Sequence, residues 1–244
     1  MNDLSKPPVV NKDICRIPLP PEEVIKTGSE HLPKMSEITW RIFRIMAEFV
    51  EGFQFLSSSS REITIFGSTR LPPENRWYQE AVKLGSMLAQ SGFTVITGGG
   101  PGIMEAANKG AYEAGGESLG LNIQLPHEQR VNPYVKRSRA FHYFFTRRVM
   151  LAASAQAYIF FPGGFGTLDE FFELVTLIQT KKAQAIPMIC VGKEFWDPMI
   201  TWVNTYLLEK FQTISPEDTN IYQVVDCAEE VFELIKDSKE RTIF

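Results

Sequence analysis

The chain has few of the residues that build metal sites and disulfide frameworks. Its 244 residues include only 3 histidines and 3 cysteines, Cys15, Cys190 and Cys227, and none of these lies at the spacing of a zinc motif. An odd number of widely separated cysteines is also untypical of a disulfide framework and fits a reducing compartment. We therefore expect a cytoplasmic protein with no metal and no cofactor.

Long apolar runs and a strong charge of one sign are missing as well. No apolar run approaches the roughly 18 residues of a membrane-spanning helix, and the first residues lack the apolar stretch of a secretion signal. The formal net charge is −4 and the pI about 5.5, which argues against a surface that coats nucleic acid. We expect neither a membrane nor a nucleic-acid partner. At 44% hydrophobic and 22% charged residues, the composition is that of a globular protein.

The first sixty residues differ from the rest. Residues 1–34 are rich in proline, which predicts an extended arm. A helix is expected over 36–56, because apolar residues recur three or four positions apart and form a stripe that should pack on the main domain or on a second subunit. The stripe consists of Ile38, Ile42, Ile45, Phe49 and Phe53. A run of serines then ends at residue 60, so we divide the chain into an N-terminal arm with its amphipathic helix (1–60) and a main domain (61–244).

Short apolar runs alternate with helical patterns through the rest of the chain. The expected strands cover residues 63–66, 93–96, 118–123, 157–161, 187–191 and 221–225. Residues 124–141 are expected to form a longer loop. Repeated strand–helix–strand units predict an α/β fold with a doubly wound, Rossmann-like parallel sheet and an N-terminal helical extension.

Three of the expected strands end in loops that contain glycine or serine. These loops are Gly67–Ser68, Gly98–Gly102 and Gly163–Thr167. Ligands in open parallel sheets bind outside the carboxyl ends of the strands, and glycines let the backbone approach a ligand closely. Tight packing of strand on helix is the alternative explanation for the middle loop. Three such loops at one edge favour a phosphate or nucleotide ligand.

The third loop has the most distinctive sequence. It reads Pro-Gly-Gly-Phe-Gly-Thr-Leu-Asp-Glu from Pro162 to Glu170, between an expected strand and an expected helix. Free backbone N–H groups and the helix dipole make such a junction an anion site, and Thr167 adds a hydroxyl donor. The sequence is neither a Walker A motif nor G-x-G-x-x-G. An ordinary strand-to-helix turn is the alternative.

Two arginines, Arg147 and Arg148, lie on a mostly apolar helix before the central strand, whereas the basic group at 136–139 is typical of a solvated surface. A guanidinium on such a helix needs a carboxylate or phosphate partner. A structural salt bridge to Glu170 or Glu173 is the simpler alternative. In the functional interpretation, Arg147 lies beside Glu170 at the ligand loop and keeps that carboxylate ionised. An ionised carboxylate could stabilise the oxocarbenium-like state of N-glycosidic hydrolysis or direct a water at C1′.

These motifs resemble the Lonely Guy (LOG) family of cytokinin riboside 5′-monophosphate phosphoribohydrolases, many of which carry the older label "lysine decarboxylase". Residues 162–170 match the family motif P-G-G-x-G-T-x-x-E, and Arg147 stands fifteen residues before its proline, as the family arginine does. Arg148 replaces the family lysine. The segments 66–68 and 98–106 are similar to two further family loops, so the resemblance covers about residues 62–208.

The resemblance implies that Arg147 and Glu170 are catalytic and that the chain releases a base and ribose 5-phosphate from AMP or a cytokinin riboside 5′-monophosphate, without metal or cofactor. It also implies a homodimer or a higher homo-oligomer. The implied substrate-binding residues are Gly67, Ser68, Gly99, Gly100, Glu128, Arg148, Gly163, Gly164, Gly166, Thr167 and Thr176.

Three rival functions fit parts of the sequence. Related proteins of this fold carry molybdenum cofactor or sense nucleotides without catalysis, but the presence of both Arg147 and Glu170 favours an enzyme. A pyridoxal-dependent decarboxylase needs a lysine Schiff base with an acidic partner, and we identify no lysine in such a setting. A dinucleotide oxidoreductase is disfavoured because Ile103 stands where the third fingerprint glycine would be. The base that the chain would release is not determined by these motifs.

Overall fold

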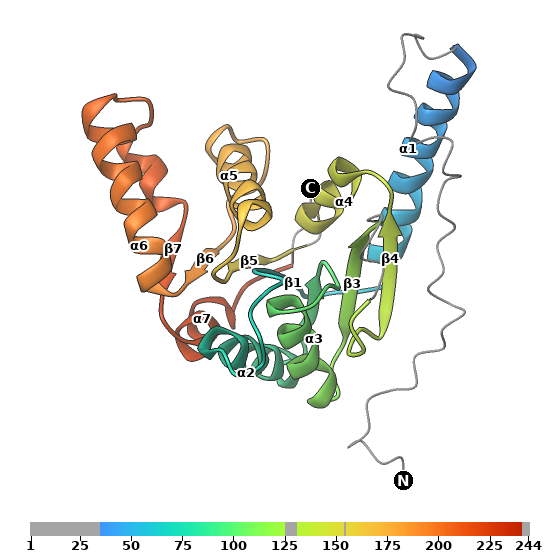
Figure 1. Ribbon diagram of the computed structural model, residues 1–244, viewed down its shortest axis with the longest axis horizontal. Helices are drawn as coiled ribbons and strands as arrows, with labels where there is room; N and C mark the ends of the chain where they lie inside the picture. The colour runs from blue at the N-terminus through green and yellow to red at the C-terminus, as the bar shows by residue number, and fades with distance from the viewer. Residues whose placement is uncertain (1–34, 125–130, 154, 241–244) are drawn as a thin grey trace.

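The computed structural model describes residues 35–124, 131–153 and 155–240, and the predicted arm over residues 1–34 lies outside them. In this part of the chain a seven-stranded sheet forms the centre, with the strand order β4-β3-β2-β1-β5-β6-β7. All neighbouring strands are parallel. Helices α1, α4, α5 and α6 cover one face and α2, α3 and α7 cover the other (Figure 1). The predicted doubly wound α/β sheet with an N-terminal helical extension is confirmed.

The elements follow the expected alternation closely. The strands are β1 (Glu62–Phe66), β2 (Thr94–Thr97), β3 (Ser118–Ile123), β4 (Arg137–Phe141), β5 (Ala157–Phe160), β6 (Met188–Val191) and β7 (Gln223–Val225). The helices are α1 (Met35–Leu56), α2 (Arg76–Gln90), α3 (Ile103–Glu113), α4 (Phe144–Ala153), α5 (Phe165–Gln179), α6 (Lys193–Trp202) and α7 (Ala228–Ile235). A π-helical segment (Val203–Lys210) continues α6, and a 3₁₀ turn (Pro216–Asn220) precedes β7. Among the described residues, no helix has the length and apolar character that crossing a membrane requires.

Strand β4 was not expected. It replaces the end of the predicted loop over 124–141 and pairs with β3. In this register Leu119 lies opposite Arg137 at one end and Ile123 lies opposite Phe141 at the other. Its sequence, RSRAF, has no apolar run. Such a sequence can still form a strand at the edge of a sheet, because an edge strand is paired on one side only and tolerates charged side chains. The basic group at 136–139 therefore belongs largely to an edge strand. Its interpretation as a solvated surface holds for Lys136, which is exposed, whereas Arg137 and Arg139 are partly covered.

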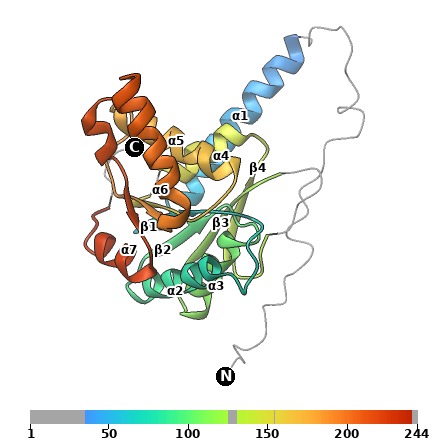
Figure 2. The same ribbon diagram turned by 60° about the vertical axis from the view of Figure 1, so that its left-hand side comes forward.

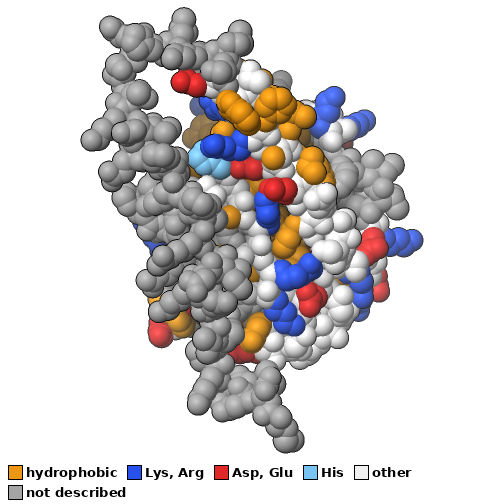
Figure 3. Space-filling view, turned by 90° about the vertical axis from the view of Figure 1, so that its right-hand side faces the viewer, with side chains coloured by type: hydrophobic (Ala, Val, Ile, Leu, Met, Phe, Trp, Pro, Cys, Tyr) orange, Lys and Arg blue, Asp and Glu red, His pale blue; other side chains and the backbone are white. Residues whose placement is uncertain are grey.

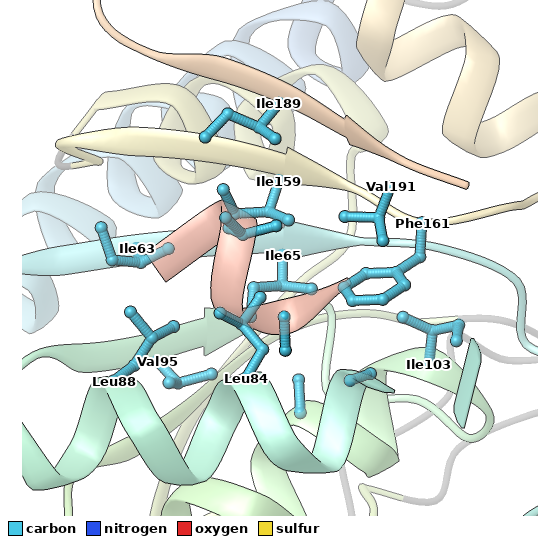
Figure 4. Close-up of a cluster of buried hydrophobic side chains, with 14 of the residues drawn as sticks. Ile63, Ile65, Leu84, Leu88, Val95, Ile103, Ile159, Phe161, Ile189 and Val191 are labelled. Carbon is cyan, nitrogen blue, oxygen red and sulfur yellow. The ribbon is translucent and has the colours of Figure 1, made fainter. Parts of the chain in front are cut away.

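The core lies on both faces of the sheet, because successive strand residues point to opposite sides. On one face, Ile63 and Ile65 of β1 pack with side chains of α2, α3 and α7 (Figure 4). On the other face, the rings of Phe66 and Phe160 stack with centroids 4.7 Å apart, and Phe171 of α5 packs against Phe160. Both faces of the central strands are thus buried, which holds their carboxyl ends rigidly side by side.

Helix α1 is attached to the sheet by its C-terminal half. A Cβ built on Gly52 would lie 2.6 Å from Met150 Sδ, so α1 and α4 approach closely at this point. The N-terminal half of α1 extends away from the body of the molecule (Figure 2). Of the predicted apolar stripe, Phe53 is half-buried, whereas Ile38 and Ile42 are 40% and 51% exposed. Within a single chain the stripe is therefore only partly covered.

Candidate active site

A cleft with a volume of about 950 Å³ opens at the carboxyl ends of the central strands. The loops that follow β1, β2 and β5 all contribute to its lining, through Gly67, Gly98 and Gly164 among others. Strands β2 to β4 extend from one side of β1, and β5 to β7 extend from the other. The cleft thus lies where the chain reverses its direction across the sheet, which is the usual ligand site of such folds.

The three loops are hydrogen-bonded to one another. Ser68 donates its backbone N–H to Pro162 O at 3.0 Å, and Ile103 donates its N–H to Ser68 O at 2.9 Å. Gly102 has φ +70°, and a Cβ there would lie only 2.3 Å from Ser68 O, so this position requires glycine. The loop after β1 therefore fixes the spacing between the other two.

A buried polar network holds the loop after β2. The Thr97 hydroxyl donates to Asn108 Oδ1 at 2.6 Å, and Asn132 Nδ2 donates to the same oxygen at 3.0 Å. Asn132 also donates its side-chain N–H to Gly100 O and its backbone N–H to Gly99 O, at 3.0 and 2.9 Å. These hydrogen bonds hold the glycine-rich backbone against α3 and the segment before β4.

The first turn of α5 contributes an anion-binding surface to the cleft. The helix begins at Phe165, and the first N–H groups of a helix have no partner inside it. Neither Gly164 nor Gly166 has a positive φ, and a Cβ at either position would meet no atom within 4 Å. The described chain therefore does not require glycine at these two positions, and the open space above them suits the approach of a ligand. Gly163 differs, because a Cβ there would lie 2.2 Å from Thr167 Oγ1.

Arg147 of α4 and Glu170 of α5 form a buried ion pair at the cleft. Arg147 Nη2 donates to Glu170 Oε1 at 3.0 Å, and the two side chains are 15% and 13% exposed. Burial raises the pKa of Glu170 to about 7, although the positive charge of Arg147 acts in the opposite direction. This corrects the expectation that Arg147 keeps Glu170 ionised: at neutral pH the carboxyl group is partly protonated.

The guanidinium of Arg147 also reaches the loop after β2. A Cβ built on Gly98 would lie 3.5 Å from Arg147 Nη1, and the guanidinium carbon lies 5.5 Å from the centre of the Phe144 ring. Burial lowers the pKa of Arg147, but an arginine stays protonated in proteins. Its Nε is buried and has no hydrogen-bond partner in the described part of the chain. Arg147 thus brings a positive charge and an unpaired donor to the site.

A comparison with protein families identifies the chain. The profile of the family described as "Possible lysine decarboxylase" matches residues 104–235, more than half of the sequence. The chain belongs to this family. The matched region contains both Arg147 and Glu170, and the LOG resemblance of the sequence motifs is confirmed by the names of the relatives that follow.

Relatives in this family include three with similar names. A probable cytokinin riboside 5′-monophosphate phosphoribohydrolase, LOGL5, of Oryza sativa subsp. japonica is 28% identical over 165 residues, covering 66% of this chain and 65% of that protein. The rice cytokinin riboside 5′-monophosphate phosphoribohydrolase LOG is 27% identical over 157 residues, which cover 63% of this chain and 64% of that protein. A phosphoribohydrolase of Rhodococcoides fascians is 23% identical over 159 residues, with 63% and 79% covered. The chain spans just under two thirds of the length of the two rice proteins.

Solved structures share the fold. The molybdenum cofactor binding protein of Rippkaea orientalis superposes with a TM-score of 0.56 at 23% identity, over 73% of this chain and 96% of that one. The molybdenum cofactor carrier protein of Chlamydomonas reinhardtii gives a TM-score of 0.52 at 22% identity, over 72% of this chain and 99% of that one. At these identities the likeness concerns the fold alone.

Most of the site residues implied by the family resemblance line the cleft. Those that do are Gly67, Ser68, Gly100, Arg147, Gly164, Gly166, Thr167 and Glu170. Gly99 and Gly163 are not among the lining residues, and a Cβ at these positions would collide with Asn122 and Thr167 respectively. Glu128 lies outside the described residues.

Two of the implied substrate-binding residues are not brought to the cleft. Arg148 pairs with Asp169 at 2.6 Å and with Glu173 at 3.1 Å, so it joins α4 to α5. Thr176 lies near the C-terminal end of α5, where its exposed hydroxyl donates to Phe172 O. In this structure both residues support the helices and do not line the cleft.

The cleft also contains polar residues that the motifs did not indicate. Arg70, Asn122 and Arg139 line it, from the loop after β1 and from β3 and β4. The position of Asn122 at the end of a predicted strand could have suggested it, whereas Arg139 was hidden because β4 was taken for a loop. Asn122 Oδ1 is buried and has no partner among the described residues.

The lining also limits the chemistry of the site. The described residues that form it include Arg70, Arg139 and Arg147 but no lysine for a Schiff base. In the described ranges, no group of three or more His, Cys, Asp or Glu residues could hold a metal ion.

The raised pKa of Glu170 predicts how stability depends on pH. In the unfolded chain Glu170 has the ordinary pKa of 4.5, whereas in the folded chain its pKa is about 7. Its contribution to the stability of the folded chain is therefore fully present below pH 4.5 and is lost as the pH rises through about 7. Glu170→Gln stays neutral. We therefore predict that its Tm relative to the unsubstituted chain rises between about pH 5 and about pH 8 in calorimetry. Glu217→Gln, at an exposed position, is the control. A Tm difference for Glu170→Gln that stays constant over this range would contradict the raised pKa.

Proposed function

We propose that the chain is a nucleoside 5′-monophosphate phosphoribohydrolase. It would hydrolyse the N-glycosidic bond of AMP or a cytokinin riboside 5′-monophosphate and release the free base and ribose 5-phosphate. The observation that carries this proposal is the buried pair of Arg147 and Glu170 beside the N-terminus of α5, inside a cleft at the switch point of the sheet. The names of the relatives support the same activity.

The first turn of α5 is the assigned site of the 5′-phosphate. Its free N–H groups and the helix dipole favour an anion, and the space above Gly164 and Gly166 is open. The buried Thr167 is 6% exposed and lines the cleft, so its hydroxyl is a further donor. A phosphate held there places the ribose near Glu170, which lies one turn further along the same helix.

Glu170 is assigned to the sugar. Cleavage of the N-glycosidic bond builds positive charge on the ribose, which an ionised carboxylate stabilises. A carboxylate with a pKa of about 7 is also a suitable base for the attacking water at neutral pH. The hydrogen bond from Arg147 fixes Oε1 and leaves Oε2 for the substrate or the water.

Apolar side chains line the same cleft and suit a purine base. They are Ile123, Val131, Ala140, Phe144 and Leu151. A volume of about 950 Å³ lies at the upper end of the range for small-molecule sites. The cleft therefore offers room for a base that carries a substituent.

The rival proposal is a carrier of nucleotide or molybdenum cofactor that performs no reaction. Its support is the fold shared with the two solved proteins, which bind that cofactor according to their titles. A carrier has no need for a buried acid–base group held beside an arginine, whereas a hydrolase does. The rival therefore predicts binding without release of base.

We also propose that the chain forms a homodimer or a larger homo-oligomer. Large apolar side chains are exposed on α1, α4 and α5, which cover the same face of the sheet (Figure 1). Trp40 and Phe43 of α1 are 73% and 55% exposed, and Phe144 of α4 is 51% exposed. Monomeric proteins rarely leave such a surface in water.

Light scattering tests this assembly. We expect a mass of at least about twice that of the 27.7 kDa chain, and Phe43→Glu should lower it because a charge cannot be buried in an apolar interface. Leu234→Glu, at a half-exposed position on the opposite face, is the control and should leave the mass unchanged. A mass of one chain without any substitution would contradict the assembly.

Release of free base from a panel of nucleoside 5′-monophosphates and matching nucleosides tests the function. We predict release from AMP or an N6-substituted AMP, with kcat/KM at least about tenfold above that of the nucleoside, because charge-assisted hydrogen bonds to the phosphate are lost. Activity should survive EDTA. Equal kcat/KM for AMP and adenosine would contradict the phosphate site. Binding without any release would favour the carrier.

Two glycine variants sharpen the same assay. Gly166→Ala should leave stability within about 1 kcal/mol, since its Cβ meets no atom, and should raise KM for AMP by obstructing the phosphate. Gly163→Ala should instead lower the Tm, because its Cβ collides with Thr167. If Gly166→Ala binds AMP as well as the unsubstituted chain, the first turn of α5 is not the phosphate site.

A further inference from the structure

Helix α1 is fastened to the strand–helix unit that carries Arg147. Glu51 of α1 forms an ion pair with Arg139 of β4, and the side chain of Arg137 donates to Ser58 Oγ at 2.7 Å. Figure 3 shows this side of the molecule, with hydrophobic side chains gathered toward the top and charged side chains of both signs below them. Polar contacts of α1 and of Ser58, which follows it, thus fall on β4 and, through Glu48, on the turn from β4 to α4.

Glu48 is the buried member of this set. It is 8% exposed, and its Oε1 accepts a hydrogen bond from the backbone N–H of His142 at 2.7 Å. Its Oε2 lies 3.4 Å from the backbone nitrogen of Tyr143 and 2.5 Å from Thr146 Oγ1, both of which donate to it. The donors belong to the short connection between β4 and α4 and to the first turn of α4. A negative charge at this end of a helix is also favoured by the helix dipole.

The backbone that Glu48 holds is the backbone from which Arg147 projects. Arg147 follows Thr146 in the chain and donates its backbone N–H to Tyr143 O at 3.3 Å. Its guanidinium bonds Glu170, which belongs to a different helix, α5. Any displacement of the first turn of α4 therefore changes the position of the guanidinium relative to Glu170 and to the loop after β2.

We propose that Glu48 is a positioning residue for Arg147, and that α1 thereby forms part of the active site's architecture. This inference rests on the proposed function, because it assigns Glu48 to the same site. Without the Glu48 carboxylate, the N–H groups of His142 and Tyr143 lose their acceptor and the turn is free to shift. A purely structural Glu48 would add stability and leave the turnover of the folded enzyme unchanged.

The first experiment measures kcat for base release from AMP. Glu48→Ala should lower kcat by up to about 10²-fold, the scale expected when a catalytic group is misplaced. Glu48→Gln keeps one acceptor oxygen and should restore most of kcat. Gln54→Ala removes an exposed side chain of the same helix and is the control, with kcat unchanged.

A double-mutant cycle separates positioning from stability. If Glu48 acts through Arg147, Glu48→Ala should have little further effect on kcat in an Arg147→Ala background. Additive losses of kcat, or a folded Glu48→Ala variant with the kcat of the unsubstituted enzyme, would overturn the proposal.

The second experiment does not depend on activity. The charged groups that act on Glu170 are Arg147 and Arg148 from α4 and Asp169 and Glu173 from α5. Because Arg147 lowers the pKa of Glu170, a displaced Arg147 should raise the midpoint of the Glu170 carboxyl titration, followed by NMR with ¹³C-labelled glutamate and assigned with Glu170→Gln. We expect this rise in Glu48→Ala and not in Gln54→Ala.

The two experiments distinguish the two proposals. A raised midpoint in a chain that releases no base would sustain the positioning role and overturn the proposed function. Base release with neither kcat nor midpoint altered in Glu48→Ala would overturn the positioning role and leave the proposed function standing.

Discussion

The burial of the Arg147–Glu170 ion pair is the constraint on which the site depends. Removing two charges from water costs more than their mutual attraction returns unless further hydrogen bonds compensate. Here compensation is incomplete, because Arg147 Nε has no partner among the described residues and burial raises the pKa of Glu170 to about 7. The pair is therefore a poor stabiliser of the fold. In the proposed function its role is instead to act on a ligand that brings a developing positive charge to the carboxylate.

The rest of the architecture keeps this pair in place. The two residues come from helices on the same face of the sheet, and Arg148 joins those helices through Asp169 and Glu173. Below them, the loop after β1 is hydrogen-bonded to the loops after β2 and β5, so the three glycine-bearing segments form one rigid edge. In the proposed function, Arg147 and Glu170 would thus be preorganised for catalysis, as electrostatic stabilisation of a transition state requires.

The sequence predicted the sheet, the helical extension and the assembly of the three loops, because apolar strands and glycine-rich strand ends depend on local patterns. It did not predict β4, since an edge strand with two arginines has no apolar signal. The contact of Glu48 with the turn before α4 was also unpredictable, because it joins residues 94 positions apart. The pKa of Glu170 was misjudged for a related reason: the arginine is visible in the sequence, whereas the depth of burial appears only in the folded chain.

The turnover of a folded Glu170→Gln variant tests the central claim most directly. The substitution keeps the size of the side chain and removes its negative charge, and the proposed phosphate site in the first turn of α5 stays intact. The account predicts that kcat for base release from AMP falls by about 10²-fold or more, the scale of a positioned acid–base group, while KM changes little. A folded variant with unaltered kcat would contradict it and reduce Arg147 and Glu170 to a structural salt bridge.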